Sequence, residues 1–205
     1  MKIKALTLLL ITILCVSCNN SKTNTTTKKS TEKTAGNDKE QIEKLIKSAN
    51  AWGDSKNGSS GITYYTIDEK TGICTGIDIK KHQLELKKLK NSGHFSAAFI
   101  ENFNQIGLKR DQMIKIKKIP NWKPNEEIGP FSGYSSWCNC QEGGDVKKIK
   151  IKIISLNDQE GSLSWTWSEP EYSKGFEYQF KVVKENGKWK IAYLEGFDFE
   201  RNTKL

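Results

Sequence analysis

Apolar and polar residues alternate with a period of two in the second half of the chain. From Ile149 to Ile153 every second residue is isoleucine, and the residues between them are lysines. This alternation is typical of a strand that exposes one face to solvent. A second strand, SLSWTWS, follows after the loop 157–161. If this loop closes a hairpin, the expected cross-strand partners are Leu156 with Ser162, Ile153 with Trp165 and Ile151 with Trp167.

A second hairpin is predicted near the C-terminus, where Asn186-Gly187 lies in the middle of the sequence FEYQFKVVKENGKWKIAYLEGFDF. Both central residues of a type I′ turn need a positive φ, which asparagine and glycine adopt readily. The turn fixes the register and gathers the large apolar residues on one face. The expected partners are Glu185 with Lys188, Lys184 with Trp189, Val182 with Ile191 and Phe180 with Tyr193.

The first half of the chain has the helical period instead, with apolar residues three and four positions apart. Three helices are expected: one from Lys39 to Gly53 with a cap at Asn37 or Asp38, one after Asp78 that closes at Asn91 and Gly93, and one from Ser96 to Gly107. Helices followed by an antiparallel sheet predict an α+β fold, in which the N-terminal helices pack on one face of a curved sheet. The length suits a single domain of residues 38–205.

The N-terminus, MKIKALTLLLITILCVSCNNS, is typical of a secretory signal peptide. Its apolar run is shorter than the roughly 20 residues that a transmembrane helix needs. The sequence VSC that ends at Cys18 resembles the bacterial lipobox, so we expect a lipoprotein signal peptide of residues 1–17 and acylation, such as palmitate attachment, at Cys18. Cys15 is not favoured because Leu14 is too bulky for the usual cleavage position. The alternative is ordinary cleavage that leaves the thiols free.

Lipidation would anchor the chain to a membrane without spanning it, because two or three acyl chains bind almost permanently. By resemblance to Gram-negative lipoproteins, Asn19 and Asn20 lack the aspartate that retains such proteins at the inner membrane, which favours the outer membrane. No acidic run for surface export follows Cys18, so the domain is expected to face the periplasm. Residues 18–37 contain almost nothing apolar and are expected to form a flexible tether.

The formal net charge of +9 raises the question of nucleic-acid binding. The lysines are scattered, however, and the chain has only two arginines, Arg110 and Arg201. Because nucleic-acid recognition usually concentrates arginine on one face, no nucleic-acid partner is expected. The charge indicates either a weak attraction to anionic lipid headgroups or an ordinary lysine-rich surface.

The whole domain, and especially its ending KENGKWKIAYLEGFDF, resembles the nuclear transport factor 2-like (SnoaL-like, cystatin-like) superfamily, and within it bacterial lipoproteins of unknown function. The resemblance implies a curved sheet that wraps a long helix into a cone, whose mouth often holds a ligand. Enzymes of the superfamily often use Asp, His or Tyr inside the cone, which points to Tyr178, Tyr193 and Asp198 here. The alternative to a ligand pocket is that helices completely fill the aromatic face of the sheet. The candidate pocket walls are Trp165, Trp167, Tyr178, Phe180 and Trp189.

The longest irregular stretch, PNWKPNEEIGPFSGYSSWCNCQEGG, is a candidate partner-binding loop. Loops of this length inside a compact domain tend to be functional or disordered. Exposed aromatic residues would form a rim that binds a partner, whereas folded-back ones would cover the open end of the cone. The aromatic residues of this loop are Trp122, Phe131, Tyr134 and Trp137.

Three cysteines follow the expected leader: Cys74, Cys138 and Cys140. In an oxidising periplasm, a disulfide from Cys74 to Cys138 or Cys140 would close a loop of roughly 65 residues, worth about 4 kcal/mol in the chain-entropy model. A bond between Cys138 and Cys140 would be strained, and reduced, buried thiols are the alternative. These thiols and His82 or His94 do not follow a recognised zinc spacing, so no metal is expected.

The sequence contains no GxSxG, no HExxH and no glycine-rich phosphate loop. With only two histidines, acid–base chemistry has few candidates. We therefore expect a non-catalytic module that binds a small apolar ligand or lipid in the cone, without a cofactor. The first alternative is a domain that binds an envelope protein through the long loop and a sheet edge. The second is a small-molecule enzyme that uses the cone pocket.

Overall fold

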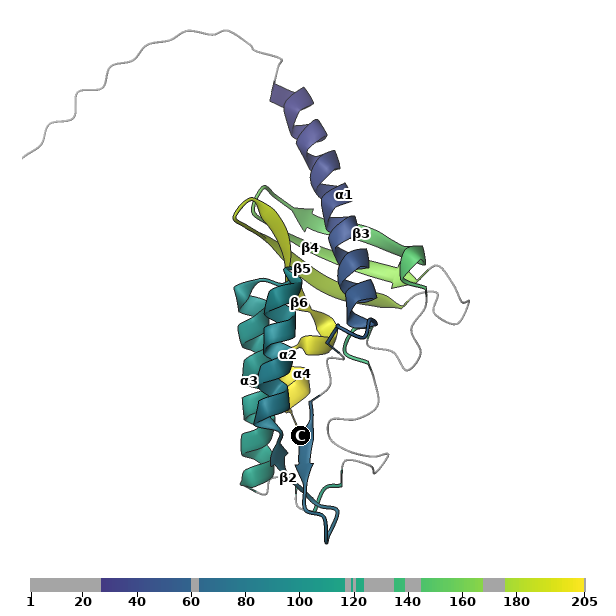
Figure 1. The fold of residues 1–205 in the computed structure, drawn as a ribbon. Helices are drawn as coiled ribbons and strands as arrows, with labels where there is room; N and C mark the ends of the chain where they lie inside the picture. The colour runs from purple at the N-terminus through teal and green to yellow at the C-terminus, as the bar shows by residue number, and fades with distance from the viewer. Residues whose placement is uncertain are drawn as a thin grey trace, which may run out of the picture.

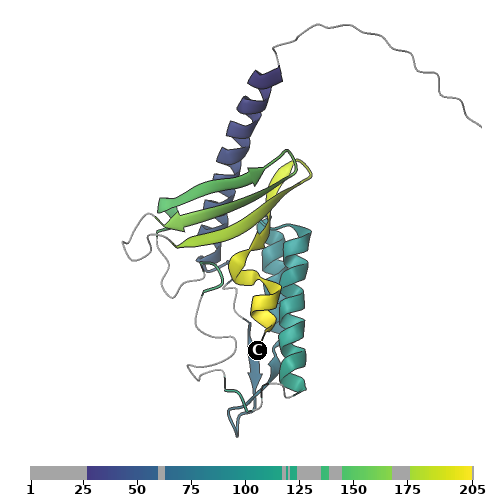
Figure 2. The same ribbon diagram turned by 180° about the vertical axis from the view of Figure 1, so that it is seen from behind.

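The computed structural model describes residues 27–59, 63–116, 119, 121–123, 135–138, 145–167 and 176–204, with side chains from residue 36 onward. Helices and a four-stranded antiparallel sheet form a mixed fold, which confirms the α+β class (Figure 1). The sheet and the first helix lie in one half of the molecule, and the next two helices lie in the other (Figures 1 and 2).

The sheet has the strand order β3-β4-β5-β6, with β3 preceded by a short 3₁₀ turn, η1. The bounds are η1 (Val146–Lys148), β3 (Ile149–Leu156), β4 (Glu160–Trp167), β5 (Glu177–Glu185) and β6 (Lys188–Leu194).

The β5–β6 hairpin has the predicted turn. Asn186 and Gly187 have φ angles of 52° and 75°, as a type I′ turn requires. Next to the turn the register is confirmed, with Glu185 opposite Lys188, Lys184 opposite Trp189 and Val182 opposite Ile191. Beyond these pairs the prediction is wrong, because the register shifts between Lys181 and Val182 and places Phe180 opposite Leu194 instead of Tyr193.

The β3–β4 hairpin has a shorter loop than expected. The side-chain oxygen of Asn157 accepts hydrogen bonds from the backbone nitrogens of Gln159 (2.8 Å) and Glu160 (2.9 Å), and β4 already begins at Glu160. Leu156 pairs with Gly161 instead of Ser162, and a register shift between Ile153 and Ser155 makes the prediction wrong by two residues from Ile153 back to Ile149. Such a slip keeps every side chain on its own face, so the large residues still meet on one side. The observed pairs are Ile149 with Trp167, Ile151 with Trp165 and Ile153 with Leu163.

Helix α1 (Thr27–Gly53) lies across the aromatic face of the sheet (Figures 1 and 2). It ends at the predicted Gly53 but begins at Thr27 instead of near Lys39, so the stretch 27–37, expected within the tether, is helical. The side chains that α1 buries completely are Ile42, Ile46 and Ala49.

Asp38 lies inside α1 and does not cap it. The indole Nε1 of Trp189 donates a hydrogen bond to Asp38 Oδ1 at 2.9 Å, and Lys184 Nζ lies 3.2 Å from the same oxygen. The Lys184 ammonium also lies 4.6 Å from the centre of the Trp189 ring. These contacts fasten α1 to the β5–β6 hairpin, because the buried carboxylate, the indole and the ammonium satisfy one another.

Helix α2 (Ile79–Ser92) has the predicted ends. The side chain of Asp78 accepts a hydrogen bond from the backbone nitrogen of Lys81 at 3.0 Å and caps the start of the helix. Gly93 follows the last turn with a φ of 70°, a conformation that glycine adopts without steric cost.

Helix α3 (Ala97–Lys115) begins after the predicted cap, Ser96, but continues eight residues past Gly107. A Cβ atom at Gly107 would lie 2.4 Å from the ring of His82 on α2. The glycine therefore allows α2 and α3 to approach closely. The prediction that the helix ends at Gly107 is wrong.

The remaining elements close the far end of the molecule. They are the ribbon β1 (Tyr65–Ile67) and β2 (Cys74–Ile77), the 3₁₀ turn η3 (Glu195–Phe197) and the short helix α4 (Phe199–Thr203). Arg110 of α3 joins two of these parts, because its guanidinium donates to Thr63 Oγ1 at 2.8 Å and to the carbonyl of Asn202 at 3.0 Å. Within the described ranges, no helix combines the length and apolar character that crossing a membrane requires.

Candidate functional site

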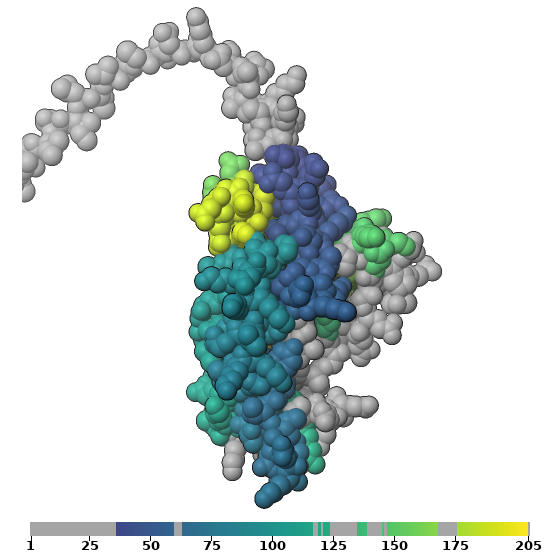
Figure 3. Space-filling model, viewed as in Figure 1, coloured from purple at the N-terminus to yellow at the C-terminus, as the bar shows by residue number. Residues whose placement is uncertain are grey.

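The aromatic face of the sheet forms the core of the protein. All five candidate wall residues are buried, with at most 6 % of the residue surface exposed, and they share one apolar cluster with Ile42 and Ile46 of α1. In the space-filling view α1 lies over the sheet, and strands are visible on either side of it (Figure 3). Neither groove described below is lined by any of the five, which are Trp165, Trp167, Tyr178, Phe180 and Trp189.

The candidate catalytic groups Tyr178 and Tyr193 take structural roles among the described residues. The hydroxyl of Tyr178 donates to the carbonyl of Ser136 at 2.6 Å and accepts from the backbone nitrogen of Gly196 at 2.9 Å. Burial raises the pKa of Tyr178 far above its ordinary value, so this hydroxyl stays protonated. Tyr193 lies beside Asp198, with 3.4 Å between the hydroxyl and Oδ2, and burial followed by the nearby carboxylate raises its pKa.

The two loop tryptophans that the structure describes fold inward. Trp122 and Trp137 are each only 7 % exposed. Trp122 packs edge-on against Tyr65, with 4.7 Å between ring centres, and Trp137 Nε1 donates to the carbonyl of Ser59 at 3.1 Å. These two residues therefore support the folded-back interpretation of the loop. The other two candidates, Phe131 and Tyr134, lie outside the described residues.

The cysteines do not form the long-range link that the sequence suggested. Cys74 is a free, buried thiol, and burial raises its pKa. Cys138 is disulfide-bonded, so Cys74 is not its partner. Cys140 and Cys18 lie outside the described residues. The part of the chain that the structure describes contains no group of three or more His, Cys, Asp or Glu side chains arranged to hold a metal.

A groove with a volume of about 470 Å³ runs along α2, which lies at the surface in front of α3 in Figures 1 and 3. Lys81, Glu85 and Lys88 follow one another at spacings of four and three residues, which places them on one side of the helix. Tyr64 forms the opposite wall and is fixed to the start of α2 by a 2.8 Å hydrogen bond from the backbone nitrogen of Asp78 to its carbonyl. The full lining is Tyr64, Lys81, Leu84, Glu85, Lys87, Lys88 and Asn91.

Glu85 is the unusual member of this groove, because its side chain is only 4 % exposed. Lys88 Nζ donates to Oε1 at 2.8 Å, and this bond raises the pKa of Lys88. The second oxygen, Oε2, is buried and has no hydrogen-bond partner among the described residues. A buried carboxylate oxygen without a donor is costly and uncommon in native proteins.

The outer wall of the groove is basic. Lys81 Nζ lies 3.7 Å from Asp78 Oδ2 and 5.4 Å from the centre of the Tyr64 ring. Lys87 is exposed and makes no ion pair with another described residue. The groove thus combines one buried negative oxygen with exposed positive charge.

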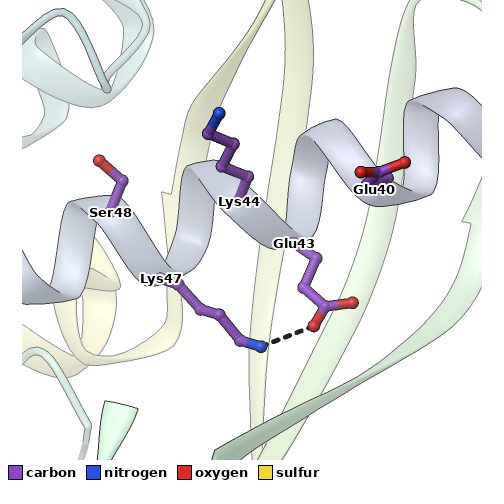
Figure 4. A pocket seen from close by; sticks show the side chains of 5 residues that line it. All are labelled: Glu40, Glu43, Lys44, Lys47 and Ser48. Atoms are coloured by element: carbon purple, nitrogen blue, oxygen red, sulfur yellow. Dashed lines mark hydrogen bonds and ion pairs between the residues drawn. The ribbon is translucent and has the colours of Figure 1, made fainter. Parts of the chain in front are cut away.

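A second, shallower groove of about 450 Å³ lies along the outer side of α1 (Figure 4). Its lining comes from this one helix, and Glu43 and Lys47 within it form an ion pair at 2.7 Å. At its end, Ser48 Oγ lies 2.8 Å from His94 Nε2. Burial and then the nearby Lys190 lower the pKa of His94, and its Nδ1 has no partner among the described residues. A serine–histidine pair without a group that orients the histidine is incomplete as a catalytic unit.

Sequence reasoning missed both grooves. The signal for Glu85 was present, because this glutamate lies three residues after His82 and four before Leu89, on the face that α2 buries. A charged residue at a buried position is informative, since it is rarely buried without a partner. The sequence gives no indication that Tyr64 lines the α2 groove or that His94 lies beside Ser48, because tertiary contacts bring both residues to these places.

Comparisons of the chain with protein-family models, with curated proteins and with solved structures found no match. The resemblance to the nuclear transport factor 2-like superfamily accordingly stays a prediction.

Proposed function

We propose that this chain is a lipoprotein, anchored through Cys18 to the outer membrane, whose domain of the nuclear transport factor 2-like type faces the periplasm and binds a small polar ligand without catalysing a reaction. The lysine-flanked apolar leader and the sequence VSC support the anchor. The groove along α2 supports the binding role. The ligand is polar because the aromatic face, which an apolar ligand would need, is filled by α1.

One observation carries the binding role: an open groove of about 470 Å³ along α2 has exposed lysines and the buried carboxylate of Glu85, one oxygen of which has no partner among the described residues, in its lining. Folding normally pairs such an oxygen, because an unsatisfied buried polar atom costs about 1–3 kcal/mol. The exposed lysines of the same groove add affinity for a negative group on the ligand.

Binding is favoured over catalysis because Lys88, the amine beside the Glu85 carboxylate, has its pKa raised by that carboxylate and stays a protonated ammonium, which is not a nucleophile. The groove lining consists of lysines, one glutamate, one tyrosine, one asparagine and one leucine. His82 of the same helix stacks on Phe103, with 5.4 Å between ring centres, and burial lowers its pKa. It is thus a packing residue, held by a 3.3 Å contact to Asn104, and not a base that faces the groove.

Native mass spectrometry of the full-length protein, purified in mild detergent from envelopes, tests the binding role. Wild type is expected to carry a bound small molecule, and Leu84→Trp is expected to lose it, because Leu84 lines the groove and is 57 % exposed. The matched control is Leu108→Trp on α3, which is 41 % exposed and lies outside the groove. Equal ligand occupancy in both variants would show that the α2 groove is not the binding site.

Membrane fractionation of Cys18→Ala tests the anchor. The variant is expected to remain an unprocessed precursor or to appear in the soluble periplasmic fraction, whereas Cys15→Ala keeps the wild-type location. Radiolabelled palmitate is expected in wild type and in Cys15→Ala alone. Incorporation of the label into Cys18→Ala would place the anchor elsewhere.

A further inference from the structure

We propose that the β3 edge of the sheet binds an extended segment of a partner protein in which acidic and apolar residues alternate. The segment would add a fifth strand to the sheet beside β3. This surface is distinct from the groove along α2, because no residue of β3 lines that groove. Three features carry the inference: the backbone of an edge strand, the lysines on one face of β3 and the exposed isoleucine on the other.

The two edges of the sheet differ. At the β6 edge, Ile191 is paired within the chain, since its backbone nitrogen donates to the carbonyl of His94 at 2.9 Å and its carbonyl accepts from the nitrogen of Ser96 at 2.9 Å. At the opposite edge, β3 pairs only with β4 among the described residues, and it is the outermost strand in Figures 1 and 2. In an edge strand, the backbone groups of every second residue point away from the sheet and can pair with another strand.

The face of β3 that points away from α1 is basic. From Val146 to Leu156 the chain contains four lysines and no acidic residue. Of these, Lys150 and Lys152 lie in β3, and the Lys152 side chain is 72 % exposed although it contacts Glu177 at 3.4 Å. Opposite charges on neighbouring strands attract, whereas like charges directly opposite each other repel. The partner strand is therefore expected to carry acidic residues beside these two lysines.

The other face of β3 is apolar and becomes more exposed along the strand. Ile149 is 3 % exposed, Ile151 is half-buried against the core and Ile153 is 36 % exposed. A strand beside β3 would cover Ile153 with a residue on the same face, because side chains of neighbouring strands lie next to each other. A segment that alternates acidic and β-branched apolar residues therefore matches both faces at once.

A second copy of the chain is a poorer occupant of this edge. Two β3 strands in antiparallel contact would place lysines of one copy beside lysines of the other, which is unfavourable. Edge lysines and a bulge, such as the one between Ile153 and Ser155, are common means of preventing this pairing. The segment Ile149–Ile153 keeps a regular register before the bulge, so it remains able to pair with a strand of opposite charge.

Fluorescence anisotropy with the full-length protein in neutral detergent tests the proposal with a labelled, end-blocked peptide, Glu-Val-Glu-Val-Glu-Val-Glu. Wild type is expected to bind it at least tenfold more tightly than the peptide in which lysine replaces every glutamate. Lys150→Glu/Lys152→Glu is expected to reverse this preference, and the gained binding would show that the variant is folded. Lys80→Glu/Lys109→Glu, which changes two exposed lysines of α2 and α3, is the matched control and should keep the wild-type preference.

Two N-methylated forms of the peptide separate strand pairing from general attraction between charges. One form is methylated at the valine nitrogens, and the other is methylated at the glutamate nitrogens. Only every second N–H of an added strand faces the protein, so one form is expected to lose binding at least tenfold while the other binds nearly as well as the parent peptide. Bound parent peptide is also expected to slow hydrogen exchange at the β3 amides that point away from β4.

Four results would overturn the proposal. Equal binding of both methylated forms would show that charge alone holds the peptide, and an unchanged preference in Lys150→Glu/Lys152→Glu would place the peptide elsewhere. No binding of the parent peptide at millimolar concentration would exclude an acidic strand as the occupant. Slow exchange of the outward β3 amides in the free protein would show that the edge is already occupied, by a second copy if sedimentation finds a dimer and by another part of this chain if it finds a monomer. None of these results would alter the ligand expected in the α2 groove, which native mass spectrometry tests separately.

Discussion

Glu85→Met is expected to stabilise the protein, because it removes a buried carboxylate oxygen that has no partner among the described residues. Methionine is unbranched like glutamate, has a similar length and helix propensity and adapts to irregular space, so the main change at this position of α2 is the loss of the charge. It removes the buried Oε2, which has no partner among the described residues, and it also removes the ion pair of Oε1 with Lys88.

The magnitude follows from these two changes. Removing a buried polar atom that lacks a hydrogen bond gains about 1–3 kcal/mol. Losing the ion pair costs only about 0.2–1 kcal/mol, because the Lys88 side chain is 41 % exposed and can be hydrated instead. The free energy of unfolding should therefore rise by about 1–2 kcal/mol. For a domain of this size, the melting temperature should rise by roughly 2–8 °C.

Urea unfolding at neutral pH, followed by the fluorescence of the six tryptophans, measures the effect. The midpoint should move to higher urea with an unchanged slope, because the surface exposed on unfolding is the same. Glu101→Met on α3 is the matched control, since its glutamate is exposed and also lies in a helix, and it should stay within about 0.5 kcal/mol of wild type. The reasoning would be refuted if Glu85→Met unfolded at lower urea than wild type, because Oε2 would then have a stabilising partner.

Three further predictions concern the contacts that hold the fold. Asp38→Ala should lower the free energy of unfolding by about 2–4 kcal/mol, because it leaves Trp189 Nε1 and the half-buried Lys184 without their acceptor; a loss below about 1 kcal/mol in urea unfolding would contradict this contact. Gly107→Ala should destabilise by about 1–3 kcal/mol although alanine favours helices, since its Cβ would lie 2.4 Å from the His82 ring; a raised melting temperature would contradict the close packing. Burial lowers the pKa of His82 and of His94 in the folded protein below the ordinary 6.5. As the pH falls, the unfolded chain therefore binds more protons than the folded protein does, and stability present above about pH 6.5 should be lost. Urea midpoints between about pH 8 and 5.5 measure this loss, which His82→Gln/His94→Gln should reduce; an equally steep loss in that double variant would assign it to other groups.

The features that the sequence determined by itself are local. Asp78 and Gly93 set the ends of α2, because a side-chain cap and a left-handed glycine act within one turn of the helix. Asn186-Gly187 set the second hairpin and the first pairs beside it, because the turn conformation depends on these two residues alone. The alternation of isoleucine and lysine likewise indicated which side of β3 faces the core, since side-chain direction in a strand follows from the backbone.

Tertiary structure decided the features that depend on distant residues. Gly107 was predicted to end a helix. In the structure it lies inside α3, where the His82 ring of α2 is so close that a Cβ atom would clash with it. Asp38 looked like a cap, but Trp189 and Lys184, far along the chain, made it a buried anchor inside a longer helix. In both hairpins a bulge changes the register of the pairs that lie farther from the turn, because a single inserted residue shifts every pair beyond it.

The candidate site followed the same division. The sequence placed Lys81, Glu85 and Lys88 on one side of a helix, because the helical period alone determines that arrangement. Only the packing of α2 in the folded chain made Glu85 a buried carboxylate with a free oxygen, and only the contact between Asp78 and Tyr64 supplied the opposite wall. Burial and enclosure arise from surfaces that meet in three dimensions, so a pattern along one helix fixes the residues of a groove but not the groove itself.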